Sequence, residues 1–275
     1  MSKRIAVFLL AVAVVASPAL AGVYYEAVTR SEGKGAEMQA SRVKAWAHGE
    51  SARVEFVESG NPMMAAGGYM VTEDGGRNLF FVNPKEKTFT RFDVEAMGQF
   101  VGGASKMVNM KISDHKVENL GEEPGGLVAG LPTTHYRYRT SYAMEMSVIG
   151  MKMRSNVVQE QDIWSAPKLV EAALGIWLRK NPPSFGNPEF DAMVKAEMGK
   201  MQGFPLKSVT RTTTTDKKGK SETTVTSMEV TKLELDLVPN VSFKVPAGYE
   251  EVDMFGGQGG EGNPFAKLMG GNKKN

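Results

Sequence analysis

A long run of alternating side chains, from Thr134 to Trp164, constrains the fold of this chain more than any other stretch. On one face of its first half, every member is aromatic or aliphatic except one threonine: Tyr136, Tyr138, Thr140, Tyr142, Met144, Met146 and Val148. Arginine, serine and glutamate dominate the alternate positions. Successive side chains of a strand point to opposite faces, so the pattern predicts a long, half-buried antiparallel strand. Alternation resumes after Gly150 and predicts the return strand of a hairpin.

Shorter alternating segments with turn residues between them predict further strands on both sides of this hairpin. They cover 23–30, 38–47, 52–58, 69–72, 78–82, 87–92, 107–120, 206–215, 222–237 and 241–245. The turns include Asp74-Gly75-Gly76-Arg77 and Asn83-Pro84, residues that tolerate or pre-set the required backbone angles. The glycine- and proline-rich stretch Gly121–Gly130 is expected to be a connection. The threonine run Thr210–Thr215 is expected on a sheet edge or a solvent-facing side.

Helical periodicity occurs twice after the hairpin. Ser165 is expected to cap a first helix, with Pro167 in its first turn. Its apolar stripe contains Leu169, Val170, Ala173, Leu174, Trp177 and Leu178. Pro188 begins a second helix, whose stripe of Phe190, Met193, Val194, Met198 and Met201 is interrupted by Glu197. A short helix over Val94–Phe100 is also expected.

These elements predict a mainly β (α+β) fold. It is a curved antiparallel sheet, or incomplete β-barrel, of about ten or eleven strands with two inserted helices. The expected organisation is a signal peptide over 1–21, one domain over 22–255, and a disordered tail rich in glycine, asparagine and lysine over 256–275.

The N-terminus predicts export. Lys3 and Arg4 precede the apolar run Ile5–Ala16, and Ala19-Leu20-Ala21 forms a cleavage site. The expected location is the bacterial periplasm, with secretion as the alternative. Of the 33 basic and 31 acidic residues, only two basic ones lie in this segment, so the mature chain is expected to be electrically neutral. Neutrality argues against nucleic acid as a partner. No later apolar run reaches transmembrane length.

Cysteine is absent from the sequence, which excludes disulfides, thiolate metal sites and a cysteine nucleophile. The three histidines, His48, His115 and His135, lack zinc-ligand spacing and are expected to be solvated or singly hydrogen-bonded. No nucleophile elbow or phosphate-binding loop occurs. The chain is therefore not expected to be an enzyme or to hold a cofactor or resident metal.

Two local motifs resemble those of a known group. They are the closing Val238-Pro-Asn-Val-Ser-Phe243-Lys-Val-Pro246-Ala-Gly248-Tyr249 and the strand entry Gly130-Leu-Pro-Thr-Thr-His-Tyr136. Together with the serial strands and the helical insertion, they make the chain similar to the periplasmic LolA/LolB-like half-barrel group, as an exported member. The resemblance implies an incomplete barrel whose apolar interior, beneath helices, holds acyl chains of lipids or lipoproteins. No individual ligand contact maps onto this sequence, and the absence of a lipid-attachment cysteine implies a soluble, carrier-like role.

Methionine is abundant, with 18 residues, and clusters at the central hairpin. A methionine-rich face suits an apolar, variable ligand, because thioether side chains adapt to irregular shapes. The residues expected to line such a cavity are Tyr138, Tyr142, Met144, Met146, Met151, Met153, Leu174, Trp177 and Met193. Clustered thioethers also bind Cu(I), which keeps a copper-binding protein open as an alternative.

The leading hypothesis from sequence is thus an exported, soluble binding protein for a lipid, acyl chain or lipidated partner. The main alternative is a structural or stress-related periplasmic interaction protein whose concavity is filled by its own side chains. The sequence does not determine the ligand or the oligomeric state.

Overall fold

A computed structural model describes residues 22–33, 40–61, 64–93, 111–148, 151–169, 188–200, 203–237 and 240–252. These residues form one twelve-stranded sheet with the strand order β12-β6-β5-β4-β3-β2-β1-β11-β10-β9-β8-β7. Every neighbouring pair is antiparallel except the short pair of β12 and β6. The expectation of an open, curved, mainly antiparallel sheet is confirmed.

Two meanders make up the sheet. The first contains β1 (Gly22–Glu32), β2 (Ser41–His48), β3 (Ser51–Ser59), β4 (Tyr69–Thr72), β5 (Asn78–Asn83) and β6 (Thr88–Asp93). The second contains β7 (Lys111–Val128), β8 (Leu131–Val148), β9 (Met151–Ala166), β10 (Phe204–Asp216) and β11 (Ser221–Leu237). They join where β1 pairs with β11.

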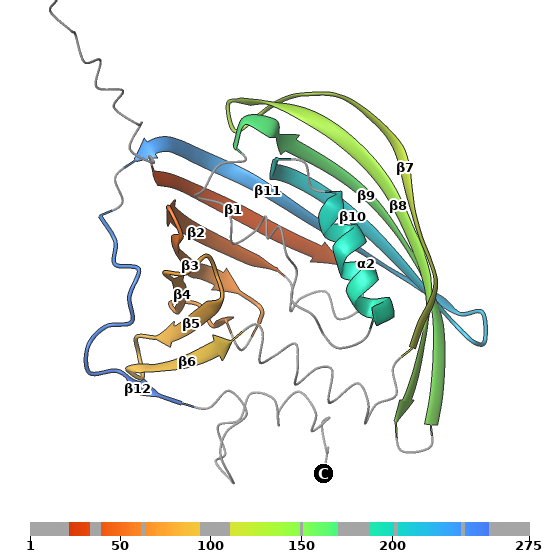
Figure 1. Cartoon of the computed structure of the whole chain (residues 1–275), viewed down its shortest axis with the longest axis horizontal. Helices are drawn as coiled ribbons and strands as arrows, with labels where there is room; N and C mark the ends of the chain where they lie inside the picture. The colour runs from red at the N-terminus through yellow and green to blue at the C-terminus, as the bar shows by residue number, and fades with distance from the viewer. Residues whose placement is uncertain are drawn as a thin grey trace, which may run out of the picture.

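The sheet curves around one side, and helix α2 (Pro188–Gly199) lies on that concave side, in front of the second meander (Figure 1). The predicted second helix is thereby confirmed. The first predicted helix is wrong at its start, because Ser165 lies within β9 and Pro167–Leu169 form a 3-10 helix. Residues 170–187, and the short helix expected over 94–100, lie outside the described residues.

The main hydrophobic core occupies the concave face of β1 to β4 and continues onto β10 and β11. Its members are mainly small or aliphatic and include Tyr25, Ala45, Val54, Met70, Leu206 and Val230. Leu206 has no exposed surface. Gly203, just before β10, has a φ of +82°, and a Cβ there would lie 2.6 Å from the carbonyl oxygen of Ala166. The start of β10 is therefore closely packed.

The closing segment 240–252 crosses the outer face of β4 to β6. Val245 and Tyr249 pack against a second cluster built on Tyr69, Val71 and Val82. The chain then forms β12 (Glu250–Glu251), which pairs in parallel with β6. The strand expected over 241–245 is thus wrong, because this segment contributes side-chain packing and leaves backbone pairing to the two residues of β12.

The turn between β4 and β5 is held by one carboxylate, as the Asp-Gly-Gly sequence predicts. Asp74 accepts hydrogen bonds from the Asn78 backbone N–H at 3.0 Å and from the Thr72 hydroxyl at 2.9 Å. Burial alone would raise the pKa of Asp74. Hydrogen bonds from the Asn78 side chain and backbone and from Thr72, together with the charge of Arg77, outweigh burial and hold the pKa below its ordinary value.

Strand β7 corrects the expectation that Gly121–Gly130 is a connection, because the strand runs through most of this stretch to Val128. Register shifts after Ser113, Asn119 and Pro124 interrupt its pairing with β8. An edge strand tolerates proline and bulges because one row of its backbone groups has no ladder partner, and such features block pairing with another chain. The proline and glycines that make this stretch resemble a loop in sequence are therefore the same features that protect the edge strand from pairing with another chain.

Candidate functional site: the concave face beneath α2

The pairing of β8 with β9 gathers most of the predicted cavity-lining positions on the concave face. Met146 is the partner of Met153, and Val148 is the partner of Met151. Tyr142 and Met144 follow along the same face of β8, since residues two apart on a strand share a face. The side chains of Met146 and Met151 lie outside the described set. The copper alternative, which needs their sulfur positions, stays a prediction.

Burial divides these predicted residues. Tyr138 is buried with 6 % of its surface exposed, and it packs beside Tyr136 and Ile163. Tyr142 and Met144, further along β8, and Met193 on α2 are half-buried. Met153 is 48 % exposed, towards the hairpin tip. Leu174 and Trp177 lie outside the described residues.

The concave face of β10 and β11 is lined by hydroxyl groups. Thr210 pairs with Gln161 on one side and Thr226 on the other, and Thr212 lies between Gln159 and Thr224 in the same way. All are half-buried. The expectation that the threonine run forms a sheet edge is wrong, because β10 lies between two long strands. Alternation sends half of its threonines towards α2. The concavity is consequently apolar over the first meander and mixed over the second.

A buried polar network fastens the end of α2 to this face. Lys200 follows the last residue of α2, and its side chain is 3 % exposed. The Lys200 Nζ donates to Gln161 Oε1 at 2.9 Å, to both Glu197 carboxylate oxygens at 2.7 Å, and to the hydroxyl of Thr140. The Thr140 hydroxyl in turn donates to Glu197 Oε1 at 2.8 Å, and the Tyr138 hydroxyl donates to the Lys200 carbonyl oxygen at 3.3 Å.

This network explains two irregularities in the sequence. Thr140 is the one polar member of the β8 stripe, and Glu197 is the polar break in the stripe of α2. The fold brings these two interruptions into hydrogen-bond contact. Sequence reasoning missed Lys200 and Gln161, which carry no periodic signal of their own. The paired interruptions were the signal that could have led to them.

The Glu197 carboxylate also affects Tyr142. Burial raises the pKa of the Tyr142 phenol, and the nearby negative charge of Glu197 raises it further. Tyr142 thus stays a neutral phenol at ordinary pH, with an apolar ring and one hydroxyl. Tyr142 and Met144 on the sheet and Met193 on α2 thus each keep part of their surface exposed to solvent.

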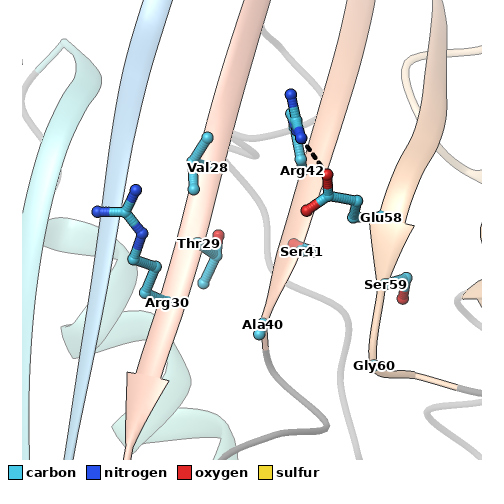
Figure 2. A pocket seen from close by; sticks show the side chains of 9 residues that line it. All are labelled: Val28, Thr29, Arg30, Ala40, Ser41, Arg42, Glu58, Ser59 and Gly60. Carbon is cyan, nitrogen blue, oxygen red and sulfur yellow. Dashed lines mark hydrogen bonds and ion pairs between the residues drawn. The ribbon is translucent and has the colours of Figure 1, made fainter.

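A hollow of about 580 Å³ lies elsewhere, at the ends of β1, β2 and β3 (Figure 2). Figure 2 shows Arg42 of β2 paired with Glu58 of β3, while Arg30 extends from β1 away from this pair. The pleat places these three charged residues on the face opposite the core residue Ala27. A charged surface hollow of this kind is not the apolar cavity that the sequence predicts.

His135 corrects the expectation of a solvated or singly bonded histidine. Its ring stacks on Trp164 with centroids 4.1 Å apart, and its two nitrogens lie 3.1 Å from Glu123 and 2.8 Å from Asp162. The cluster ties β7, β8 and β9 together on the outer face. Among the described residues, no three histidine or acidic side chains converge as a metal site would require.

In the described part of the chain, no helix has the length and hydropathy needed to cross a membrane.

Comparison with known proteins identifies the family. A model described as "Domain of unknown function (DUF4412)" matches residues 40–249. The chain belongs to the DUF4412 family. The part of the DUF4412 chain that matches includes β2 to β11, α2 and the closing segment up to Tyr249.

Among solved structures, the DUF4412 chain is similar to the LolA superfamily protein NE2245 from Nitrosomonas europaea. The two are 12 % identical, and the match covers 80 % of this chain and 89 % of the other, with a TM-score of 0.28. A TM-score of this size supports no conclusion, and the proposals below rest on the contacts within this chain. No curated protein matches it.

Proposed function

We propose that this DUF4412 chain is an exported binding protein that holds an apolar ligand, a lipid or an acyl chain of a lipidated partner, on the concave face of its sheet. The observation that carries the proposal is the half-burial of Tyr142, Met144 and Met193 beneath α2. A fully packed hydrophobic core would bury such side chains, as Tyr138 and Ile163 are buried on the same face. Solvent-accessible apolar area facing a helix is what an acyl chain would cover, at about 25 cal/mol per Å².

The predicted export supports the proposal, because a periplasmic carrier would meet lipids and lipoproteins between two membranes. The predicted signal peptide over residues 1–21 would deliver the chain there. Cell fractionation and N-terminal sequencing test this step. We expect a periplasmic protein that begins at Gly22, and a chain that retains its first residues in the cytoplasm would contradict it.

Native mass spectrometry of the full chain, purified from the periplasm of its own host, tests binding. We expect additional mass from co-purified lipid, or uptake of lipid on incubation. Met144→Glu should reduce uptake, because a charge on the concave face opposes burial of an acyl chain. Leu120→Glu is the matched control, since Leu120 lies on the edge strand β7 and is 50 % exposed. A protein that neither carries nor takes up lipid would contradict the proposal.

The alternative of an interaction protein with a filled concavity has its own support. The core over β1 to β4 is closely packed, with Ala45, Ala47 and Ala52 each at most 3 % exposed. If the measured mass is that of the ligand-free protein under all conditions, and a protein partner remains bound through purification, the result would favour this alternative over lipid binding.

A further inference from the structure

The network at the end of α2 has an unusual composition for a contact that only docks a helix. Lys200 and Glu197 are three residues apart on one segment, a spacing at which an ion pair on a solvated helix surface contributes little to stability. Here the lysine faces the sheet and is buried, so it loses its hydration. An apolar side chain at this place would dock the helix at lower cost.

The surroundings of Lys200 are suited to an anion. Thr140 and Gln161 contribute uncharged polar atoms, and the ammonium lies 5.6 Å from the centre of the Tyr138 ring. Among the described residues, Glu197 is the carboxylate within hydrogen-bond distance of the lysine. Because Glu197 is 26 % exposed while Lys200 is 3 % exposed, the carboxylate reaches the buried cation from the solvent side.

An apolar path leads away from this cation along the same face. Tyr142 and Met144 follow Thr140 on β8, and Ile112 on β7 is the partner of Met144. Met144 lies four residue steps beyond Thr140 on the strand, which corresponds to about 13–14 Å. One cation at the end of an apolar path of this length matches an anionic head followed by a single aliphatic chain.

We propose that Lys200 is the binding site for the carboxylate headgroup of a single-chain amphiphile, and that Glu197 occupies the place of this headgroup when no ligand is bound. The inference rests on the proposed function, to which it adds the chemical class of the ligand. Binding breaks no covalent bond: the ligand carboxylate replaces the Glu197 carboxylate at Nζ, and the aliphatic chain lies along Tyr142 and Met144.

Calorimetric titration of the full chain with dodecanoate and with dodecanol tests the inference, because the two differ in headgroup charge. Glu197→Gln removes the competing carboxylate. We expect it to strengthen dodecanoate binding about tenfold and to leave dodecanol binding unchanged, since a charge-assisted hydrogen bond is about twice as strong as a neutral one. Lys200→Gln should weaken dodecanoate binding to the level of dodecanol.

Glu234→Gln is the matched control, because Glu234 pairs with Lys232 at 2.7 Å, the same distance, with both side chains largely exposed. It should alter neither affinity. If Glu197→Gln binds dodecanoate no better than the wild type, the headgroup assignment is overturned, whether or not Lys200→Gln folds. If both ligands bind and neither substitution changes the ratio of their two affinities, the assignment of the headgroup site is wrong while the binding function stands. Failure of both ligands to bind would contradict the binding function itself.

Discussion

Replacement of Thr140 by valine is the sharpest test of how α2 is held. Thr140 is 1 % exposed, and valine has nearly the same shape, so the substitution removes the hydroxyl without opening a cavity. Two hydrogen bonds to charged groups disappear, the one donated to Glu197 and the one accepted from Lys200. Gln161 and Glu197 remain as partners of the lysine.

The magnitude follows from the charge of these partners. A hydrogen bond to a charged group contributes about 1.5–3 kcal/mol, but the lysine keeps its other acceptors and valine favours a strand. We therefore expect Thr140→Val to lower the free energy of unfolding by about 2–3 kcal/mol. With an m-value of about 3 kcal/mol per M urea, the midpoint should fall by about 0.7–1 M.

Urea unfolding followed by circular dichroism measures this shift, and native-state hydrogen exchange shows where it acts. The amides of α2 should lose protection before those of β1 and β2. Thr212→Val is the matched control on the same face, because its hydroxyl accepts one long bond of 3.5 Å from Gln159. That variant should stay within about 0.5 kcal/mol of the wild type. Equal stability of the two variants would refute the account of the network.

Three further predictions concern the scaffold and are tested by the same urea assay. Leu206→Ala should lower the free energy of unfolding by about 3–5 kcal/mol, because the side chain is fully buried. Leu127 is 73 % exposed, so Leu127→Ala should lower it by less than about 0.5 kcal/mol. Similar losses in the two variants would contradict the assigned core. Gly203→Ala should lower the free energy of unfolding by more than about 2 kcal/mol. Gly219→Ala, with a similar φ of +80° but no atom within 4 Å of its Cβ, should cost only about 1 kcal/mol, and a reversed order would contradict the close packing at β10. The lowered pKa of Asp74 contributes stability that is present above the ordinary aspartate pKa of 3.8 and is lost as pH falls through the folded value. Asp74→Asn should therefore lose less stability than the wild type as the pH falls below 3.8, and parallel pH profiles would contradict the assignment.

Much of the fold could be predicted from the sequence, because alternation is a local signal. The central hairpin and the second helix agree with their patterns to within a few residues. The prediction is wrong where the exposure of a strand's residues depends on which strands lie beside it in the sheet. Pro124 and its flanking glycines look like a loop until β7 is known to be an edge strand, and the threonines of β10 look exposed until β9 and β11 flank them.

For the same reason, alternation predicts which residues of the candidate site share a face, while their binding of a ligand stays a prediction. Alternation placed Tyr138, Tyr142 and Met144 on one face, and the register of β8 and β9 confirms that arrangement. Lys200 was missed because its burial depends on contacts with residues about 40 and 60 positions away in sequence. Only the three-dimensional structure shows that a charged residue after a helix lies inside the concavity.

Photo-cross-linking tests most directly the claim that the concave face beneath α2 binds an acyl chain. The full chain would be equilibrated with a fatty acid that carries a diazirine in its tail, then irradiated, digested and mapped by mass spectrometry. We predict labelled peptides from β8, β9 and α2, with Tyr142 and Met144 among the modified residues, and competition by unlabelled dodecanoate. Labels confined to the outer face, or labelling that dodecanoate does not reduce, would contradict the claim.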